Sequence, residues 1–155
     1  MKFSDFIVEK AIIPELKSHD RDGVLRELVT ALAANGALPA AAVEDVVAAL
    51  IKREKNGSTG FGKGVAVPHV KHPRVRKMVG TIGRSTRGID FAALDHQPVY
   101  SVVLLLSPEN QPQQHLAAMN IIFTNLQKDT FRKFLRQSAT MAAIKDLLDE
   151  ADSGR

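Results

Sequence analysis

The chain has 155 residues, a formal net charge of +4 and no cysteine, with 45% hydrophobic and 25% charged residues. This composition is typical of a globular protein with a sizeable core, and the lack of cysteine excludes disulfides, thiol nucleophiles and cysteine zinc sites. No apolar run has the length of a membrane span and no secretion signal opens the chain, so we expect a cytoplasmic location without membrane insertion.

The N-terminal part of the chain is predicted to contain an irregular start and then a long helix. Ser4 is a candidate cap for a short first helix, and residues 11–16 are predicted to form a brief strand interrupted by a proline. Apolar side chains then recur at helical spacing over residues 24–32, with Ser18 or Asp20 as the N-cap. An Asn-Gly pair provides the stop for this helix.

The next stretch leads from a second helix to a histidine. Helical spacing over residues 39–55 places Arg53 on the last turn of that helix. Four glycines within residues 57–64 form a loop that can adopt positive φ angles and turn its amides toward an anion. A short buried strand over residues 65–67 and a stiffening proline then precede His69. An imidazole held in this way is a candidate phosphoryl acceptor.

Two further strands are predicted in the middle of the chain. Residues 78–84 indicate a strand, followed by a turn over residues 85–89 centred on Gly88 and an irregular segment over residues 90–97. Residues 99–107 indicate a stronger strand that is apolar on both faces. We therefore expect this strand to be central and covered on both sides.

Three helices are predicted to complete the fold. Apolar residues at three- and four-residue steps mark a helix over residues 116–126, with His115 at its beginning. Two shorter helices follow, the last of them capped by Thr140. About four strands and five helices, with helices on both sides of a sheet, describe an α/β three-layer sandwich. We assign residues 1–150 to one domain and residues 151–155 to a disordered tail.

Residues 57–69, with the sequence GSTGFGKGVAVPH, resemble the phosphohistidine motif of the type-2 IIA domains of the bacterial phosphoenolpyruvate-dependent phosphotransferase system. These are the fructose, mannitol and nitrogen-regulatory IIA proteins. The likeness continues in order through residues 87–91, 94–99, 104–108, 115–116 and 131–132. It covers nearly the whole chain and implies a mixed β-sheet flanked by helices on both faces.

The resemblance implies a cytoplasmic phosphoryl carrier that works through a phosphohistidine. His69 matches the histidine that accepts a phosphoryl group from the phosphocarrier protein HPr and passes it to a IIB domain or uses it as a regulatory signal. His115 matches the family's second active-site histidine, and Arg53 matches its arginine at the end of the second helix. We favour the nitrogen-regulatory type over a sugar-transport subunit, because nothing in the sequence indicates a sugar. The scheme requires no metal and no other cofactor.

The glycine loop contains the predicted phosphate-binding residues, Gly62, Lys63 and Gly64, whose amides and charge suit an anion. The family usually has asparagine where this chain has Lys63, and a small residue where it has Val70. Lys63 either adds a charge for the phosphoryl group or repels a basic partner. Val70 is expected to narrow the space beside His69.

Without the resemblance, the same residues have ordinary structural explanations. A glycine-rich stretch is usually a turn, His115 suits a helix cap, and Arg53 suits the negative end of a helix dipole. The loop is not a Walker A motif, since Lys63 is followed by glycine rather than serine or threonine.

Two other functions are alternatives to the phosphoryl carrier. The first is a binding module that controls a partner protein by contact, without catalysis. The second is nucleic-acid binding through the basic residues 71–77, which the low net charge and the scarcity of interleaved aromatic residues disfavour. We therefore expect no nucleic-acid partner.

Overall fold

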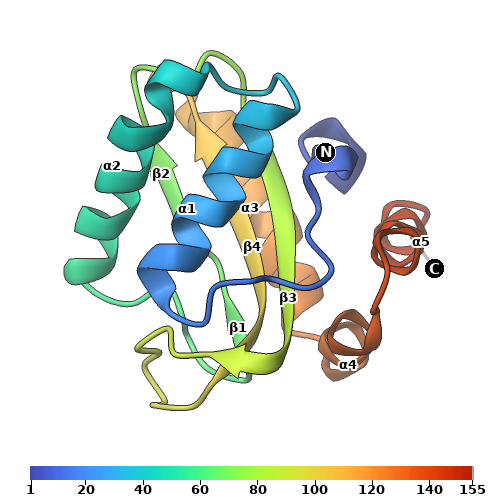
Figure 1. Ribbon diagram of the computed structural model, residues 1–155. Helices are drawn as coiled ribbons and strands as arrows, with labels where there is room; N and C mark the ends of the chain where they lie inside the picture. Colours follow the sequence, from blue (N-terminus) through green and yellow to red (C-terminus); the bar gives the residue numbers. More distant parts are fainter. Residues whose placement is uncertain (155) are drawn as a thin grey trace.

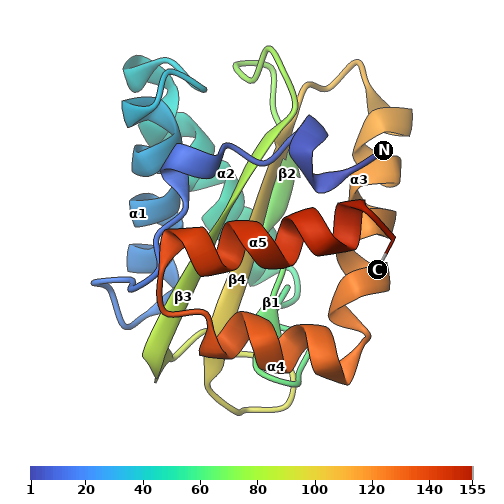
Figure 2. The ribbon, with the colours of Figure 1, turned by 90° about the vertical axis from the view of Figure 1, so that its right-hand side faces the viewer.

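The computed structural model describes residues 1–154 and has three layers, with a sheet between two layers of helices (Figure 1). Helices α1 and α2 cover one face of the sheet, and α3, α4 and α5 cover the other (Figure 2). The helices are α1 (Arg21–Ala34), α2 (Val43–Lys55), α3 (Pro112–Leu126), α4 (Asp129–Gln137) and α5 (Met141–Asp152). The strands are β1 (Val65–Ala66), β2 (His69–Lys71), β3 (Val79–Ile89) and β4 (Val99–Ser107). This arrangement confirms the predicted three-layer α/β fold.

The sheet is mixed, and β4 lies at its centre. Strands β1 and β2 both pair in parallel with β4 in one register, with Val65 opposite Ser101 and His69 opposite Leu105. They therefore lie end to end along one edge of β4, and β3 pairs antiparallel along the other edge. Every residue of β4 except Tyr100 is buried, which confirms that this strand is central and covered on both sides.

Alternation along β4 divides the core between the two faces of the sheet. Leu104 belongs to the apolar cluster formed with α1 and α2, and Leu105 belongs to the cluster formed with α3, α4 and α5. Side chains opposite one another in paired strands face the same side of a sheet, so His69 faces the α3 layer with Leu105. Val70 packs against the α1–α2 core instead. It therefore does not narrow the space beside His69 as expected.

The N-terminal segment differs from the sequence prediction. Residues 11–16 do not form a strand, and Ile13 makes only a single bridge to Gly83 of β3. Ser4 is not a cap, because Lys2 occupies the N-cap position of the first short helix. Within residues 1–154, three 3-10 helices are present, at Phe3–Asp5, Glu9–Ala11 and Ala40–Ala42.

Two of the predicted helix caps are confirmed by hydrogen bonds. The Asp20 carboxylate accepts the N–H of Gly23 at 2.8 Å at the start of α1. The Thr140 hydroxyl accepts the N–H of Ala143 at 3.1 Å at the start of α5. Each bond satisfies a backbone donor that has no partner within its own helix.

Strand β3 continues through the segment predicted as a turn, residues 85–89, and ends at Ile89. Gly88 has a φ of +93°, and its register with β4 shifts between Arg84 and Ile89. The glycine therefore permits an irregularity within a strand rather than a reversal of the chain. The sequence also does not indicate β2, because this strand is short and has polar residues at both ends.

Helix α5 extends through Asp152, two residues into the segment predicted as a tail. The Asp152 carboxylate accepts the N–H groups of Phe3 at 2.7 Å and Ser4 at 3.0 Å, which ties the two ends of the chain together. Arg155, the last residue of the predicted tail, lies outside the described residues. Among residues 1–154, no helix has both the length and the apolar character of a membrane span.

Candidate functional site

His69 is the first residue of β2, and its ring is held by the chain immediately before it. The ring Nδ1 lies 2.6 Å from the carbonyl oxygen of Val67. A carbonyl oxygen can only accept, so Nδ1 carries the proton and Nε2 keeps its lone pair in the neutral ring. Pro68 has no N–H, but its carbonyl accepts the N–H of Leu105 at 3.0 Å, which fixes the backbone against β4. His69 therefore keeps Nε2 unprotonated, and its side chain is half-buried.

The surroundings of His69 keep its ring neutral near pH 7. Burial is the largest cause and lowers the pKa of His69, and the positive charges of Arg53 and Lys71 lower it further. The bond to Val67 and the charge of Glu54 act in the opposite direction, but the pKa remains below its ordinary value. The unprotonated form, which is the nucleophilic one, is thus the stable form at physiological pH.

His115 lies in the first turn of α3 and is brought next to His69 by the fold. The centroids of the two rings are 5.7 Å apart. The side chain of His115 is buried, and its Nδ1 is 2.6 Å from the Oγ of Ser107 at the end of β4. Burial first, and then the charges of His69 and Lys71, lower the pKa of His115 to about 4. His115 is therefore also neutral near pH 7.

Arg53 lies on the last turn of α2, as predicted from the sequence, and its positive charge lowers the pKa of His69. Its Nη1 donates to the carbonyl oxygen of Gly57 at 2.7 Å, which leaves the other guanidinium donors available. This contact joins the end of α2 to the beginning of the glycine loop.

A buried pair beside Arg53 is a feature that sequence reasoning missed. Glu54 is 4% exposed, and its carboxylate accepts both the N–H of Thr59, at 3.0 Å, and the Thr59 hydroxyl. The Thr59 carbonyl in turn accepts the N–H of Val67 at 3.1 Å. The loop is thus tied to the backbone two residues before His69. Only the spacing of an acidic residue at a helix end and a threonine in the following loop could have signalled this pair.

The structure does not bring Gly62, Lys63 and Gly64 next to His69. These three residues have φ angles of +113°, +61° and +77°, and the Gly64 carbonyl accepts the N–H of Tyr100 at 2.8 Å. His69 lies opposite Leu105, five residues further along β4. At ~3.3 Å per residue this separation is roughly 16 Å. The predicted phosphate-binding loop therefore lies toward the other end of the strand.

Lys71, which belongs to the basic residues 71–77, is a second cation at the site and was not predicted there from the sequence. It follows His69 by two residues in β2, so both side chains point to the same side of the sheet. Its charge lowers the pKa of both His69 and His115. The side chain is exposed and can approach an anion bound between the two rings.

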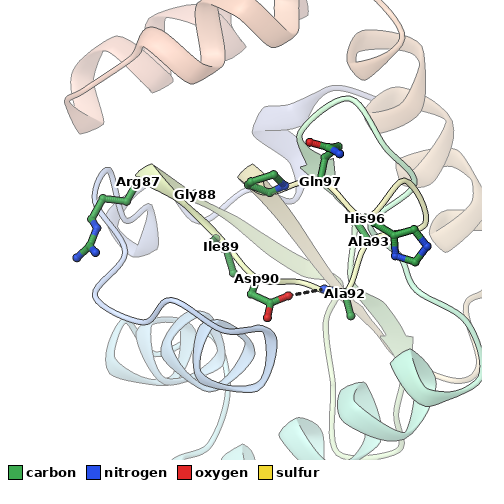
Figure 3. Close-up of a pocket in the computed structure, with 9 residues that line it drawn as sticks. Arg87, Gly88, Ile89, Asp90, Ala92, Ala93, His96 and Gln97 are labelled. Atoms are coloured by element: carbon green, nitrogen blue, oxygen red, sulfur yellow. Dashed lines mark hydrogen bonds between the residues drawn. The ribbon is translucent and has the colours of Figure 1, made fainter.

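A separate hollow of about 450 Å³ lies where β3 ends and the connection to β4 begins. Figure 3 shows Arg87 and His96 at opposite ends of this hollow, with Asp90 between them bonded to the backbone of Ala92. None of the predicted site residues lines it. Among residues 1–154 there is also no group of three or more acidic or histidine side chains that could hold a metal ion.

The geometry around His69 suits the transfer of an anionic group. One neutral histidine offers Nε2, a second histidine stands beside it, and Arg53 and Lys71 supply positive charge. Such a set of donors stabilises a transferred group that carries about two negative charges, as a phosphoryl group does.

Comparison with known proteins places these residues in context. Residues 5–151 match the family model described as "Phosphoenolpyruvate-dependent sugar phosphotransferase system, EIIA 2". The chain is 38% identical over 148 residues to a nitrogen regulatory protein of Bradyrhizobium diazoefficiens, which covers 96% of this chain and 95% of that protein. It is 31% identical over 152 residues to the fructose-specific EIIABC component of the Bacillus subtilis phosphotransferase system, covering 98% of this chain and 24% of that protein.

Solved structures share the same fold. The nitrogen regulatory protein IIA-Ntr from Neisseria meningitidis superimposes with a TM-score of 0.82 at 27% identity, over 92% of this chain and 96% of that one. A chain in the Escherichia coli complex of mannitol enzyme IIA with phosphorylated mannitol enzyme IIB superimposes with a TM-score of 0.76 at 20% identity, over 96% of both chains.

Proposed function

The chain belongs to the EIIA 2 family of the phosphoenolpyruvate-dependent sugar phosphotransferase system, a family of phosphoryl carriers, and we propose that His69 is the residue that carries the phosphoryl group. The observation that carries this proposal is the bond between Nδ1 of His69 and the Val67 carbonyl at 2.6 Å. It leaves Nε2 unprotonated and aimed away from its own backbone.

In the proposed reaction, Nε2 of His69 attacks the phosphorus of a donor phosphohistidine in line with the bond that breaks. A new N–P bond forms on Nε2 as the N–P bond of the donor is released, and the donor nitrogen keeps the electron pair. Nδ1 retains its proton throughout, because the Val67 carbonyl accepts it. Positioning and charge stabilisation account for the rate, since the protein has little covalent work to do in phosphoryl transfer.

Three side chains stabilise the incoming charge in this proposal. Arg53 offers its free guanidinium donors, and Lys71 adds a second positive charge. When the Ser107 hydroxyl donates to Nδ1 of His115, Nε2 of that ring carries a proton that can be donated to a phosphoryl oxygen. Gly62, Lys63 and Gly64 are left out of this set because of their distance along the strand from His69.

We propose that an HPr-like phosphocarrier is the donor and that a IIB domain or a regulatory target is the acceptor. The family membership supports a phosphocarrier, and the mannitol enzyme IIA of the same fold is found in a complex with its phosphorylated IIB. The regulatory role is favoured, because a relative that matches nearly end to end is a nitrogen regulatory protein. Leu116, which follows His115 and is 62% exposed, gives such a partner an apolar contact beside the site.

The test is a labelling experiment with phosphoenolpyruvate, enzyme I and HPr. We expect an acid-labile phosphate on the wild-type chain and none on a His69→Ala variant. A His19→Gln variant is the matched control and should label like the wild type, because His19 is exposed and distant from His69 in the sequence.

Equal labelling of the His69→Ala variant would refute the assignment. If neither protein is labelled but both capture the same partner, the alternative of a contact-only regulatory module is the better description.

A further inference from the structure

A second cluster of positive charge lies around a hollow of about 590 Å³ between β3 and α4. Its lining includes one carboxylate, Asp129, and five cations, which are Lys63, Arg84, Arg132, Lys133 and Arg136. A smaller hollow of about 230 Å³ adjoins it and shares Lys63, Arg132 and Arg136. The smaller hollow adds a second carboxylate, Asp95, which accepts the backbone N–H of Lys63 at 3.3 Å. With five cations and two carboxylates, the two hollows together have a charge excess of +3. We call this region the α4 pocket.

Two of the five cations form the rigid base of the α4 pocket. Arg84 is 7% exposed and donates to the carbonyl oxygens of Arg136 at 2.6 Å and Pro14 at 3.1 Å, with the Glu15 carboxylate 3.6 Å away. Arg132 donates to the carbonyl of Leu126 at 2.6 Å and pairs with Asp129. These arginines have carboxylate partners and hold α4 against its neighbours.

The other three cations have no such partner. Within the described part of the chain, Lys63, Lys133 and Arg136 form no ion pair. The guanidinium of Arg136 lies over the ring of Tyr100, 3.5 Å from its centroid, which fixes its position. Like charges gathered in a concave site repel one another, and a bound anion relieves this repulsion.

The shape and chemistry of the α4 pocket select the class of anion. Arginine guanidinium groups match phosphate oxygens with paired donors, and lysine adds a mobile charge. Two adjoining hollows that share three cations, Lys63, Arg132 and Arg136, suit a ligand with more than one phosphate group. The Tyr100 ring is covered by Arg136, so it does not offer that face for stacking against a nucleobase.

We propose that the α4 pocket is a binding site for a small molecule that carries two or more linked phosphate groups. The site is independent of His69, since Lys63 lies beside Gly64 at the level of Tyr100 and His69 lies opposite Leu105. The two sites can therefore be occupied at the same time. Recognition takes place through the phosphate groups rather than through a base or a sugar.

Calorimetric titration of the full chain with pyrophosphate and with tripolyphosphate, at physiological ionic strength, tests this proposal. We expect saturable binding of both probes, with tripolyphosphate the tighter of the two. The double variant Lys133→Gln with Arg136→Gln should weaken binding about tenfold or more, because it removes two of the three unpaired cations. The double variant Lys10→Gln with Lys17→Gln makes the same change of net charge at exposed positions elsewhere and should bind like the wild type.

A Lys63→Asn variant separates the loss of a cation from a loss of folding. Asparagine tolerates the positive φ of this position better than lysine does, so the fold is retained while the shared cation is lost. We expect weaker tripolyphosphate binding in this variant, and unchanged binding in His69→Ala. The latter result separates the α4 pocket from the proposed phosphorylation site.

Several results would overturn the α4 pocket as a polyphosphate site. Wild-type affinity in both Lys63→Asn and the Lys133–Arg136 double variant would do so, as would equal weakening in the Lys10–Lys17 control. Citrate binding as tightly as tripolyphosphate would show that the pocket takes any multivalent anion. A single-stranded RNA oligonucleotide that binds at the same residues more tightly than tripolyphosphate would replace the small ligand with a nucleic acid.

Discussion

The glycine loop and His69 belong to the same sequence motif, but they lie beside opposite ends of β4. Gly64 lies at the beginning of that strand, where its carbonyl accepts the N–H of Tyr100, whereas His69 lies opposite Leu105 near the end. His115, far away in the sequence, is brought to within 5.7 Å of His69 between ring centroids. The motif over residues 57–69 thus extends along β4, and its two ends lie far apart. The site around His69 is instead assembled from segments that are distant in the sequence.

Substitution of Gly64, in the glycine loop, should lower the stability of the fold more than a change at any other position considered below. Gly64 and Gly36 have nearly equal φ angles, +77° and +76°. A Cβ at Gly64 would lie 3.2 Å from the Tyr100 ring, whereas a Cβ at Gly36 would meet nothing within 4 Å. We expect Gly36→Ala to lose about 1 kcal/mol of unfolding free energy from the backbone alone, and Gly64→Ala to lose about 2 to 3 kcal/mol.

Urea unfolding of the two glycine variants measures this difference directly. Equal losses in both would mean that Tyr100 gives way without cost and that the loop is not packed against β4 as described.

At the other end of β4, the two histidines should make the free energy of unfolding depend on pH. The pKa of His115 is about 4 in the native chain, and an unfolded histidine has a pKa of about 6.5. Between these values the unfolded chain binds a proton that the native chain does not, so stability rises with pH and falls on acidification. We expect a loss of about 2 kcal/mol between about pH 7 and about pH 5, to which the lowered pKa of His69 adds in the same direction.

Denaturant unfolding at both pH values, with a His115→Gln variant beside the wild type, checks this window. The variant should lose most of the dependence. A wild-type stability that stays level from pH 7 to pH 5 would show that His115 is more easily protonated than its burial indicates.

The smallest effect concerns Ser107, whose Oγ lies 2.6 Å from Nδ1 of His115. Without this hydroxyl, the tautomer and orientation of His115 are no longer fixed, so a Ser107→Ala variant should accept phosphate about fivefold more slowly, or ~1 kcal/mol in the barrier. Ser101→Ala is the matched control, because Ser101 is another buried serine of β4. If the initial labelling rates of the two variants fall equally, Ser107 acts only through the packing of the strand.

The sequence predicted those features of the fold that depend on neighbouring residues, namely helix caps and the apolar pattern of a central strand. Asp20 and Thr140 cap their helices as expected, and the doubly apolar segment over residues 99–107 is the central strand. The three-residue strand β2 and the extension of β3 through Gly88 were not predicted, because both depend on pairing with β4, which no local pattern reports.

The site divides in the same way. Arg53, His69 and His115 could be named from the resemblance to a family, but their proximity is a product of the folded chain. The buried Glu54–Thr59 pair and the approach of Lys71 required coordinates, since an acidic residue at a helix end and a lysine in a basic segment are ordinary surface features in a sequence. The separation of Lys63 from His69 likewise follows from the strand register alone.

The contact between Nδ1 of His69 and the Val67 carbonyl decides which ring nitrogen is available to the phosphoryl group. Because the carbonyl holds the proton on Nδ1, Nε2 is the nitrogen left free. The most direct test is NMR of the chain phosphorylated by HPr, with nitrogen-15 in the histidine rings, to locate the N–P bond. We expect phosphorus–nitrogen coupling at Nε2 of His69 and a proton at Nδ1. Phosphate on Nδ1 of His69, or on any other residue, would contradict it.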